Sequence, residues 1–129
     1  MQLSAKSSLL LLPLALGLVN AQSYNGTGIL FYFNPGLGAC GHNNTADQIV
    51  VSVSNSTFNN YPGHTTDPNN NPICQHNVTI SYNGTTVTAP VVDYCISCPD
   101  PYVGLSPAGF EEYAPIDQGV VYNVTWEVD

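Results

Sequence analysis

A short asparagine–glycine pair between two alternating runs constrains this fold more than any other feature of the chain. Valine, isoleucine, tyrosine and alanine alternate with polar residues on both sides of Asn83-Gly84, from Val78 to Val91. A type I′ turn needs positive φ at both central residues, which asparagine and glycine adopt readily. Residues 75–94 are therefore predicted to form a β-hairpin. Pro90 cannot donate a ladder hydrogen bond, so the second arm is predicted to be an edge, a bulge or a kink.

The rest of the chain predicts further short strands and one helix. Strands are expected over residues 28–33, 48–54 and 120–128, where apolar residues run together or alternate. The last strand should place Val120, Tyr122, Val124, Trp126 and Val128 on one face. A helix is expected to begin at Ser106-Pro107, with Ser106 as its N-cap, and to end at Pro115. Residues 55–71 are predicted to be a long surface loop. Many short strands favour a closed barrel, because closure leaves no exposed edge.

The first residues have the pattern of a secretory signal. A mildly basic start precedes an apolar run from Leu9 to Val19, and Ala21 ends a small-residue cleavage site. Residues 1–21 are predicted to be removed, which leaves one secreted, extracellular domain over 22–129. Four cysteines in such a chain predict two disulfides with three possible pairings. These cysteines are Cys40, Cys74, Cys95 and Cys98.

The charge balance excludes whole classes of partner. Lys6 is the one basic side chain, so residues 22–129 carry no lysine or arginine against nine carboxylates. Nucleic-acid binding needs cations that neutralise phosphates, and anionic lipid is disfavoured for the same reason. Neither a nucleic acid nor a membrane is therefore expected as a partner. An acidic surface keeps a secreted protein soluble, and a monomer is expected.

Six asparagines begin an Asn-x-Thr motif with no proline at the middle position, which is the acceptor pattern for N-linked sugar. They are Asn25, Asn43, Asn55, Asn77, Asn83 and Asn123. Any of them that carries sugar must face solvent, which constrains the fold.

Two motifs suggest a cofactor or a metal and are rejected on their context. The glycines of 36–41 match the dinucleotide fingerprint, but no helix pattern follows and no acid stands about 20 residues further on. The spacing of Cys95 and Cys98 is common in zinc sites. In an oxidising compartment such thiols pair with one another instead. No cofactor and no metal are expected.

Asp93 is the best single catalytic candidate. It follows an apolar pair at the end of a predicted buried strand, where a carboxylate could act as an acid. The competing interpretation is that Asp93 accepts hydrogen bonds from backbone amides of the next loop. Glycosidic hydrolysis usually takes two carboxylates roughly 5–9 Å apart. The sequence does not place Asp100, Glu111 or Glu112 opposite Asp93.

Five segments occur in the order of a known family. They are Tyr32-Phe-Asn-Pro-Gly-Leu-Gly-Ala-Cys-Gly41, residues 78–89 after Cys74, Val91-Val-Asp-Tyr-Cys95 with Cys98, residues 105–110, and Val124-Thr-Trp126. Together they resemble the single-domain fungal expansin-like proteins (loosenins) and the rare lipoprotein A-like domains, over nearly the whole of 28–128. The resemblance implies a six-stranded double-psi β-barrel with one or two short helices. It also suggests the pairings Cys40–Cys74 and Cys95–Cys98.

The chain departs from that family at two positions of the site. Relatives with a wall-cutting site have an aspartate directly before Leu-Ser-Pro and tend to have a threonine in the first strand. This chain has Gly104 and Phe31 there, so Asp93 alone remains. Without a second acid the paired proton donor and acceptor of hydrolysis are missing, and the chain is predicted not to be an enzyme.

A barrel groove could still bind a sugar chain. Its candidate residues are Asp93, Tyr32, Tyr94 and Tyr102, because flat aromatic faces stack on sugar rings while polar groups fix their orientation. The alternative is that these tyrosines are simply core or barrel surface.

Three functions follow, in order of preference. The first is a secreted non-catalytic protein that binds or loosens cell-wall polysaccharide of the cellulose or chitin class. The alternative is a secreted protein-binding module, such as a cysteine-protease inhibitor or a defence effector, whose partner is a protease or a host protein. It would need an exposed loop as a wedge, and 59–72 is the longest candidate. The lesser alternative is a weak glycosidase or lytic transglycosylase that uses Asp93.

Overall fold

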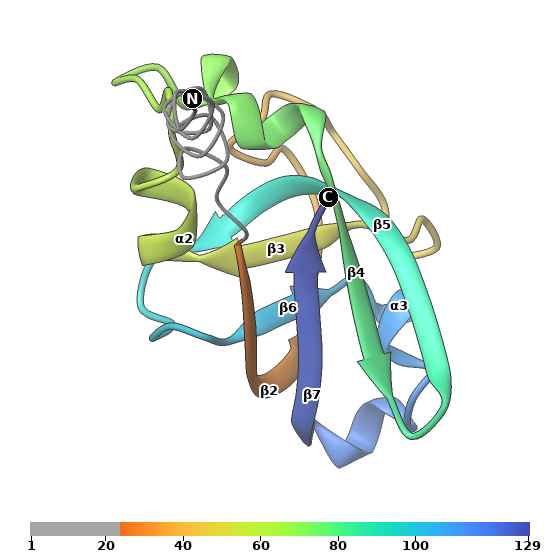
Figure 1. Ribbon diagram of the computed structural model, residues 1–129. Coiled ribbons are helices and arrows are strands. Elements are labelled where there is room, and N and C mark those ends of the chain that lie inside the picture. The colour runs from red at the N-terminus through yellow and green to blue at the C-terminus, as the bar shows by residue number, and fades with distance from the viewer. Residues whose placement is uncertain (1–23) are drawn as a thin grey trace, which may run out of the picture.

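Six strands close into a barrel in the computed structural model, which describes residues 24–129 (Figure 1). They are β2 (Asn25–Tyr32), β3 (Val51–Ser54), β4 (Asn77–Tyr82), β5 (Thr85–Cys95), β6 (Val103–Leu105) and β7 (Val120–Val128). Around the barrel the order is β2-β6-β3-β5-β4-β7. The pairs β2–β6 and β3–β5 are parallel and the other four are antiparallel. The predicted closed all-β barrel is confirmed, whereas the predicted signal at 1–21 lies outside the described residues.

Short helices fill the connections. Two are α-helices, α2 (Asn55–Asn59) and α3 (Pro107–Phe110), and three are 3-10 turns, η2 (Pro68–Asn70), η3 (Pro72–Gln75) and η4 (Ile116–Gln118). The prediction of loop throughout 55–71 is wrong at α2. Ser54 caps this helix, since its hydroxyl accepts a hydrogen bond from the Thr57 amide. Phe58 then buries its whole ring in the core.

The predicted hairpin is confirmed as β4 and β5. Asn83 and Gly84 form its turn with φ of 50° and 83°, as a type I′ turn requires. Pro90 lies within β5, opposite Asn77, and is exposed. The register irregularity comes slightly later, because Val51 pairs with Val91 while Ser52 pairs with Asp93. This bulge leaves Val92 as the extra residue.

A second bulge corrects the predicted face of the last strand. Asn123 has a φ of 62°, and the pairing with β2 shifts so that Gly28 faces Val124 while Leu30 faces Val121. The one extra residue on β7 reverses the alternation at this end of the strand. Val121 is therefore buried and Tyr122 is 62% exposed, whereas the sequence pattern had placed Tyr122 with the buried residues.

The helix expected after Ser106 is shorter than predicted. It ends at Phe110 and not at Pro115, so Glu111 and Glu112 follow it. The Ser106 side chain does not cap it. Its hydroxyl donates to the Gln48 carbonyl and accepts from the Val50 amide, which joins this corner to the start of β3.

The core lies inside the barrel and is apolar. Its fully buried side chains include Leu30, Val51, Val53, Phe58, Ile73, Val78, Ile80, Val103, Leu105 and Phe110. Two disulfides are present, Cys40–Cys74, whose Cys40 is buried at the edge of the core, and Cys95–Cys98, which confirms the pairing that the resemblance suggested. Within residues 24–129, no helix reaches the length and apolarity that crossing a membrane requires.

Candidate binding surface

The three positions singled out in the sequence lie in one row across four neighbouring strands. Asp93 on β5 pairs with Ser52 on β3, and Ser52 pairs on its other side with Gly104 on β6. Gly104 in turn pairs with Phe31 on β2. The structure therefore brings Phe31, Gly104 and Asp93 to one region of the barrel, with the buried Ser52 between them.

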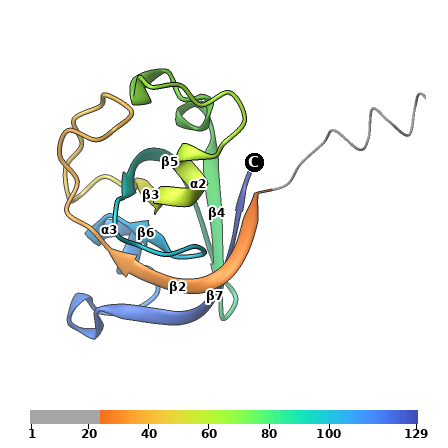
Figure 2. The same cartoon turned by 90° about the vertical axis from the view of Figure 1, so that its left-hand side faces the viewer.

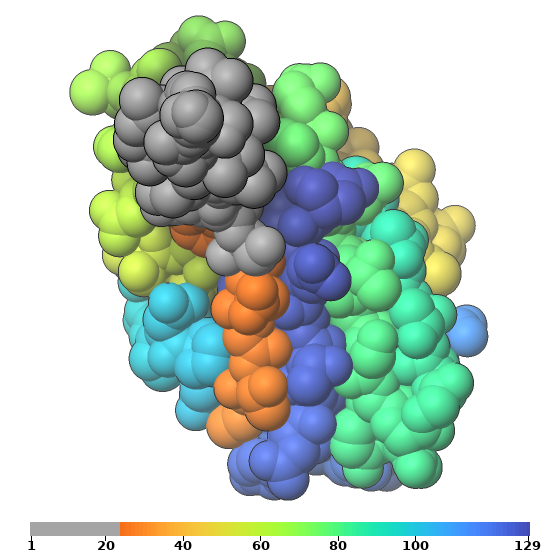
Figure 3. Space-filling view, viewed as in Figure 1, coloured from red at the N-terminus to blue at the C-terminus, as the bar shows by residue number. Residues whose placement is uncertain are grey.

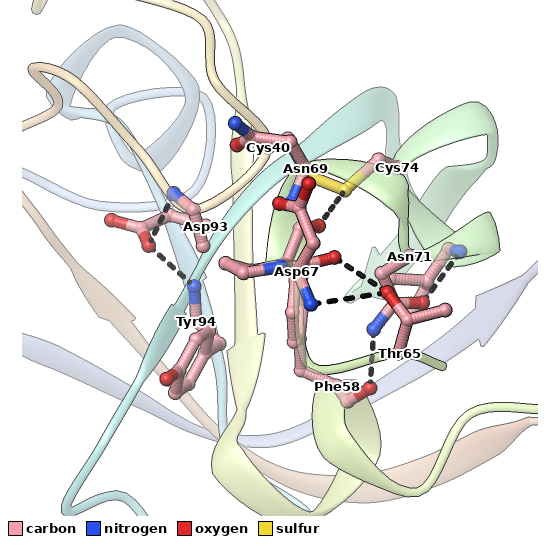
Figure 4. Close-up of a disulfide and its surroundings, with 12 residues drawn as sticks. Cys40, Phe58, Thr65, Asp67, Asn69, Asn71, Cys74, Asp93 and Tyr94 are labelled. Atoms are coloured by element: carbon pink, nitrogen blue, oxygen red, sulfur yellow. Dashed lines mark hydrogen bonds between the residues drawn. A yellow bond between two sulfur atoms is a disulfide. The ribbon is translucent and has the colours of Figure 1, made fainter.

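Asp93 is engaged by backbone amides. One of its carboxylate oxygens accepts a hydrogen bond from the Ala39 amide at 3.1 Å and from the Tyr94 amide at 2.8 Å (Figure 4). Ala39 belongs to the loop after β2, far away in sequence. Asp93 thus fastens this loop to the end of β5. Its partners are backbone amides, as the interpretation opposed to catalysis expected, but they belong to the loop after β2 and to β5 itself and not to the loop that follows Asp93.

Phe31 occupies the space that a side chain at position 104 would need. A Cβ added to Gly104 would lie 2.6 Å from Cε2 and 2.7 Å from Cζ of the Phe31 ring. The aromatic ring therefore stands at the position for which the expansin-like resemblance implies an aspartate. No acid faces Asp93 from this position.

The three acids that the sequence could not place opposite Asp93 have surroundings of their own. One oxygen of Asp100 accepts hydrogen bonds from the hydroxyls of Ser54 at 3.0 Å and Thr57 at 2.9 Å, at the start of α2. Asp100 therefore holds the Cys95–Cys98 loop to α2. Glu111 and Glu112 are exposed beyond the end of α3.

The three candidate tyrosines are all half-buried. Tyr94 stacks on Phe58, with ring centroids 4.6 Å apart, and Tyr32 meets Phe110 edge-on at 5.6 Å. Tyr102 lies in the loop before β6, where its amide donates to the Pro99 carbonyl. Each tyrosine keeps part of its surface in solvent, so a role in a glycan groove stays a prediction.

Sequence reasoning missed a prominent exposed side chain, Leu37. It is 77% exposed on the loop of residues 34–44, called here the Leu37 loop. A bridge pairs Leu37 with Asn43. The Gly38 amide donates to the His42 carbonyl at 3.0 Å, and the Asn44 amide donates to the Gly36 carbonyl at 2.9 Å. The available signal was a leucine between two glycines in the loop that follows β2.

The Leu37 loop is anchored to the barrel at several points. The Cys40 amide donates to the Val92 carbonyl at 3.1 Å, and Cys40 is bonded to Cys74 (Figure 4). Gly38 approaches β5 so closely that a Cβ there would lie 2.3 Å from the Val92 carbonyl oxygen, so this position requires glycine. The loop is therefore rigidly supported below its exposed leucine.

The segment 59–72, predicted as a wedge, adjoins the Leu37 loop. Position 41 faces Asn69, whose Oδ1 would lie 2.9 Å from a Cβ on Gly41. Asp67 accepts hydrogen bonds from Asn69 and Asn70 within this segment, and the buried Asn71 donates to the Phe58 carbonyl (Figure 4). The two loops therefore meet at Gly41 and Asn69, next to the Cys40–Cys74 disulfide, whose Cys74 sulfur lies 3.6 Å from the Pro68 carbonyl. Among residues 24–129, no group of three or more histidine, cysteine or acidic side chains could hold a metal ion.

Relatives of this chain include an inhibitor and an allergen homologue. The papain inhibitor of Streptomyces mobaraensis is 38% identical over 99 residues, which cover 75% of this chain and 66% of that protein. A homologue of allergen Asp f 7 from Arthroderma benhamiae is 40% identical over 75 residues, or 56% of this chain and 23% of that protein. The matched segment is thus a part of each curated relative. No family model matches the chain.

Solved structures agree on the fold. The Streptomyces papain inhibitor superposes with a TM-score of 0.73 and 38% identity over 81% of this chain and 94% of the inhibitor. An expansin of Clavibacter michiganensis, solved in complex with cellohexaose, gives a TM-score of 0.64 at 18% identity over 82% of this chain and 50% of the expansin. The double-psi barrel is therefore confirmed.

Proposed function

This chain belongs to the family of the Streptomyces papain inhibitor, and from that premise we propose that it is a secreted inhibitor of papain-like cysteine proteases. The observation that carries the proposal is the 38% identity over 94% of the inhibitor structure. The relatives favour this function over polysaccharide binding, which the sequence alone favours. The two disulfides fit an extracellular protein.

The Leu37 loop is the best candidate for the contact with the protease. An apolar side chain held out on a rigid support loses little conformational entropy when it enters a pocket. Such central, well-packed anchors carry most of the binding energy of a protein interface. The adjoining segment 59–72 would then contact the rim of the active-site cleft, in keeping with its predicted role as a wedge.

A non-catalytic role agrees with these relatives and with the site. The relative named a papain inhibitor is described by a binding function and not by a reaction. Phe31 fills the place of the second acid, and Asp93 binds two backbone amides. A weak glycosidase or transglycosylase is the least favoured function, because Phe31, Gly104 and Asp93 supply one carboxylate where hydrolysis usually needs two.

Titration of papain with the purified protein tests the proposal. The residual papain activity should fall in proportion to the added protein. It should reach its minimum near one equivalent when the papain concentration is well above the dissociation constant of the complex. A serine protease such as trypsin serves as the control and should keep its rate. An unchanged papain rate at a tenfold excess over micromolar enzyme would rule out this function.

Polysaccharide binding is the second candidate, because the barrel shares its fold with an expansin that was solved with cellohexaose. The tyrosines 32, 94 and 102 would supply the stacking surface. This second function is also the one that a closer relation to the loosenins or to the rare lipoprotein A-like proteins would imply. Insoluble cellulose and chitin should then deplete the protein from solution, and full recovery in the supernatant would dismiss it.

A further inference from the structure

Four of the six sequon asparagines gather on one face of the barrel. This face is the outer surface of β2, β7, β4 and the first half of β5, which lie side by side in Figure 3. Asn25 lies in β2, Asn77 in β4, Asn123 in β7 and Asn83 in the turn between β4 and β5. All four are exposed, as an acceptor of sugar must be in the folded protein.

Strand geometry keeps each motif together on this face. Residues two apart on a strand point to the same side, so Asn25 lies with Thr27 and Asn77 with Thr79. Asn83 and Asn123 both have positive φ, which asparagine tolerates better than most residues. Within residues 24–129, the side-chain amides of these four asparagines make no hydrogen bond.

The sequon at Asn55 differs in its contacts. Asn55 begins α2 and is half-buried. Its side-chain nitrogen donates to the Ile96 carbonyl at 3.3 Å, and its side-chain oxygen accepts from Asn59. The amide of Asn55 therefore joins α2 to the Cys95–Cys98 loop, and a sugar on this nitrogen would have to displace that contact.

The sequon at Asn43 lies on the Leu37 loop, away from the four-strand face. Asn43 is exposed and is bridged to Leu37. The loop packs on Val92 at the second half of β5, and in Figure 2 it rises on the opposite side of the barrel from β4. A sugar on Asn43 would stand beside Leu37, whereas sugars on the four-strand face would leave Leu37 free.

We propose that Asn25, Asn77, Asn83 and Asn123 carry N-linked glycans in a eukaryotic secretory pathway, so that the four-strand face is covered by sugar and Asn55 stays bare. At each site a bond forms between the amide nitrogen and the anomeric carbon of a lipid-pyrophosphate-linked oligosaccharide. The lipid pyrophosphate leaves, and the amide loses one proton. The partner surface is then confined to the part of the barrel that bears the Leu37 loop.

Site mapping by mass spectrometry tests this directly. The full chain is secreted from yeast, and the folded protein is treated with peptide-N-glycosidase in heavy-oxygen water, which converts each sugar-bearing asparagine into labelled aspartate. Chymotrypsin and a glutamate-specific protease then cut the chain, because residues 22–129 offer trypsin no lysine or arginine. Label is expected at the four asparagines and absent from Asn55. Absence of label from the four-strand face, or label at Asn55, would overturn the proposal.

Matched variants give a second, independent reading. Each single change among N25Q, N77Q, N83Q and N123Q should remove the mass of one glycan from the secreted protein, whereas N55Q should leave the mass of the sugar unchanged. Single changes avoid the risk that a quadruple variant is not secreted. A variant of the first set that keeps its full sugar mass would contradict the assignment of that site.

An inhibition measurement tests the separation of the two surfaces, and this arm alone rests on the proposed function. The Thr45→Ala background is used so that no sugar can stand beside Leu37, because Thr45 completes the sequon of Asn43 and lies outside the Leu37 loop. The inhibition constant for papain should be the same within twofold before and after enzymatic removal of the glycans. A fall of the inhibition constant by more than tenfold after sugar removal would mean that the sugar covers the partner surface. The mass readings do not depend on inhibition, so failure of either idea is recognised separately.

Discussion

The ring of Phe31 lies against Gly104 across the parallel pair of β2 and β6. A methyl group at position 104 would approach two ring carbons to 2.6 and 2.7 Å, which is far inside van der Waals contact. The two departures from the expansin-like pattern are therefore one structural unit. A large side chain on one strand is compatible with the fold because its partner has none.

The first prediction concerns the coupling of this pair. Gly104→Asp should destabilise the fold by about 1–3 kcal/mol, because an overpacked site must displace the Phe31 ring. Phe31→Thr/Gly104→Asp should cost less than the sum of the two single changes, since threonine leaves room for the new carboxylate. Urea unfolding of the four proteins measures this cycle. Strict additivity would show that the two positions are independent.

The second prediction separates the structural role of Asp93 from a catalytic one. Asp93→Ala should lower the free energy of unfolding by about 1.5–3 kcal/mol, the range for hydrogen bonds to a charged group. Asp93→Asn keeps an oxygen that can accept from both amides and should cost less. Hydrogen exchange should quicken at Ala39 in the alanine variant and much less in the asparagine variant. Equal exchange in all three proteins would mean that Asp93 does not fasten the Leu37 loop.

Local patterns predicted much of the fold because they act over a few residues. Asn83-Gly84 fixed the hairpin through its backbone angles, and the alternation in β4 and β5 set the register. The bulge at Asn123 could not be foreseen, because an asparagine with positive φ looks like any other asparagine in sequence. This bulge alone moved Tyr122 from the core to the surface.

The candidate site was predicted in part for similar reasons. The resemblance correctly brought Phe31, Asp93 and Gly104 together, since it carried long-range information. Sequence indicated backbone amides as partners of Asp93, but it did not indicate Ala39, whose amide is 54 positions away. Leu37 was missed because exposure of a loop residue depends on how the loop is tied, here by Cys40 and Val92.

The third prediction compares two equally exposed apolar side chains. Leu37→Ala should weaken papain inhibition at least tenfold, because loss of a buried anchor costs about 2 kcal/mol or more at an interface hot spot. Ile96→Ala is the matched control. Ile96 is 76% exposed and Leu37 77%, but Ile96 lies on the Cys95–Cys98 loop. Inhibition constants are measured for both variants after their melting temperatures are shown to match. Equal losses in both would remove Leu37 from its assigned role.

The fourth prediction ranks the two disulfides. Cys40 and Cys74 are 34 positions apart, so replacing both with serine should cost about 4 kcal/mol in the chain-entropy model. Cys95 and Cys98 are three apart, and the same model gives about 1.5 kcal/mol for their replacement. Thermal or urea unfolding of the two double variants checks this order. The reverse order would mean that strain or residual unfolded structure outweighs loop closure.

The last prediction concerns stability at high pH. Burial raises the pKa of Tyr113 to about 12, and its hydroxyl donates to the Ile80 carbonyl at 2.6 Å. The unfolded phenol ionises near pH 10. The folded pKa is the higher one, so this contribution to stability is complete below pH 10 and is lost as the pH rises towards 12. The free energy of unfolding should therefore fall more steeply between pH 10 and 12 in the natural protein than in Tyr113→Phe. Ionisation of the other tyrosines is common to both proteins, so parallel curves would show that the buried phenol has no such role.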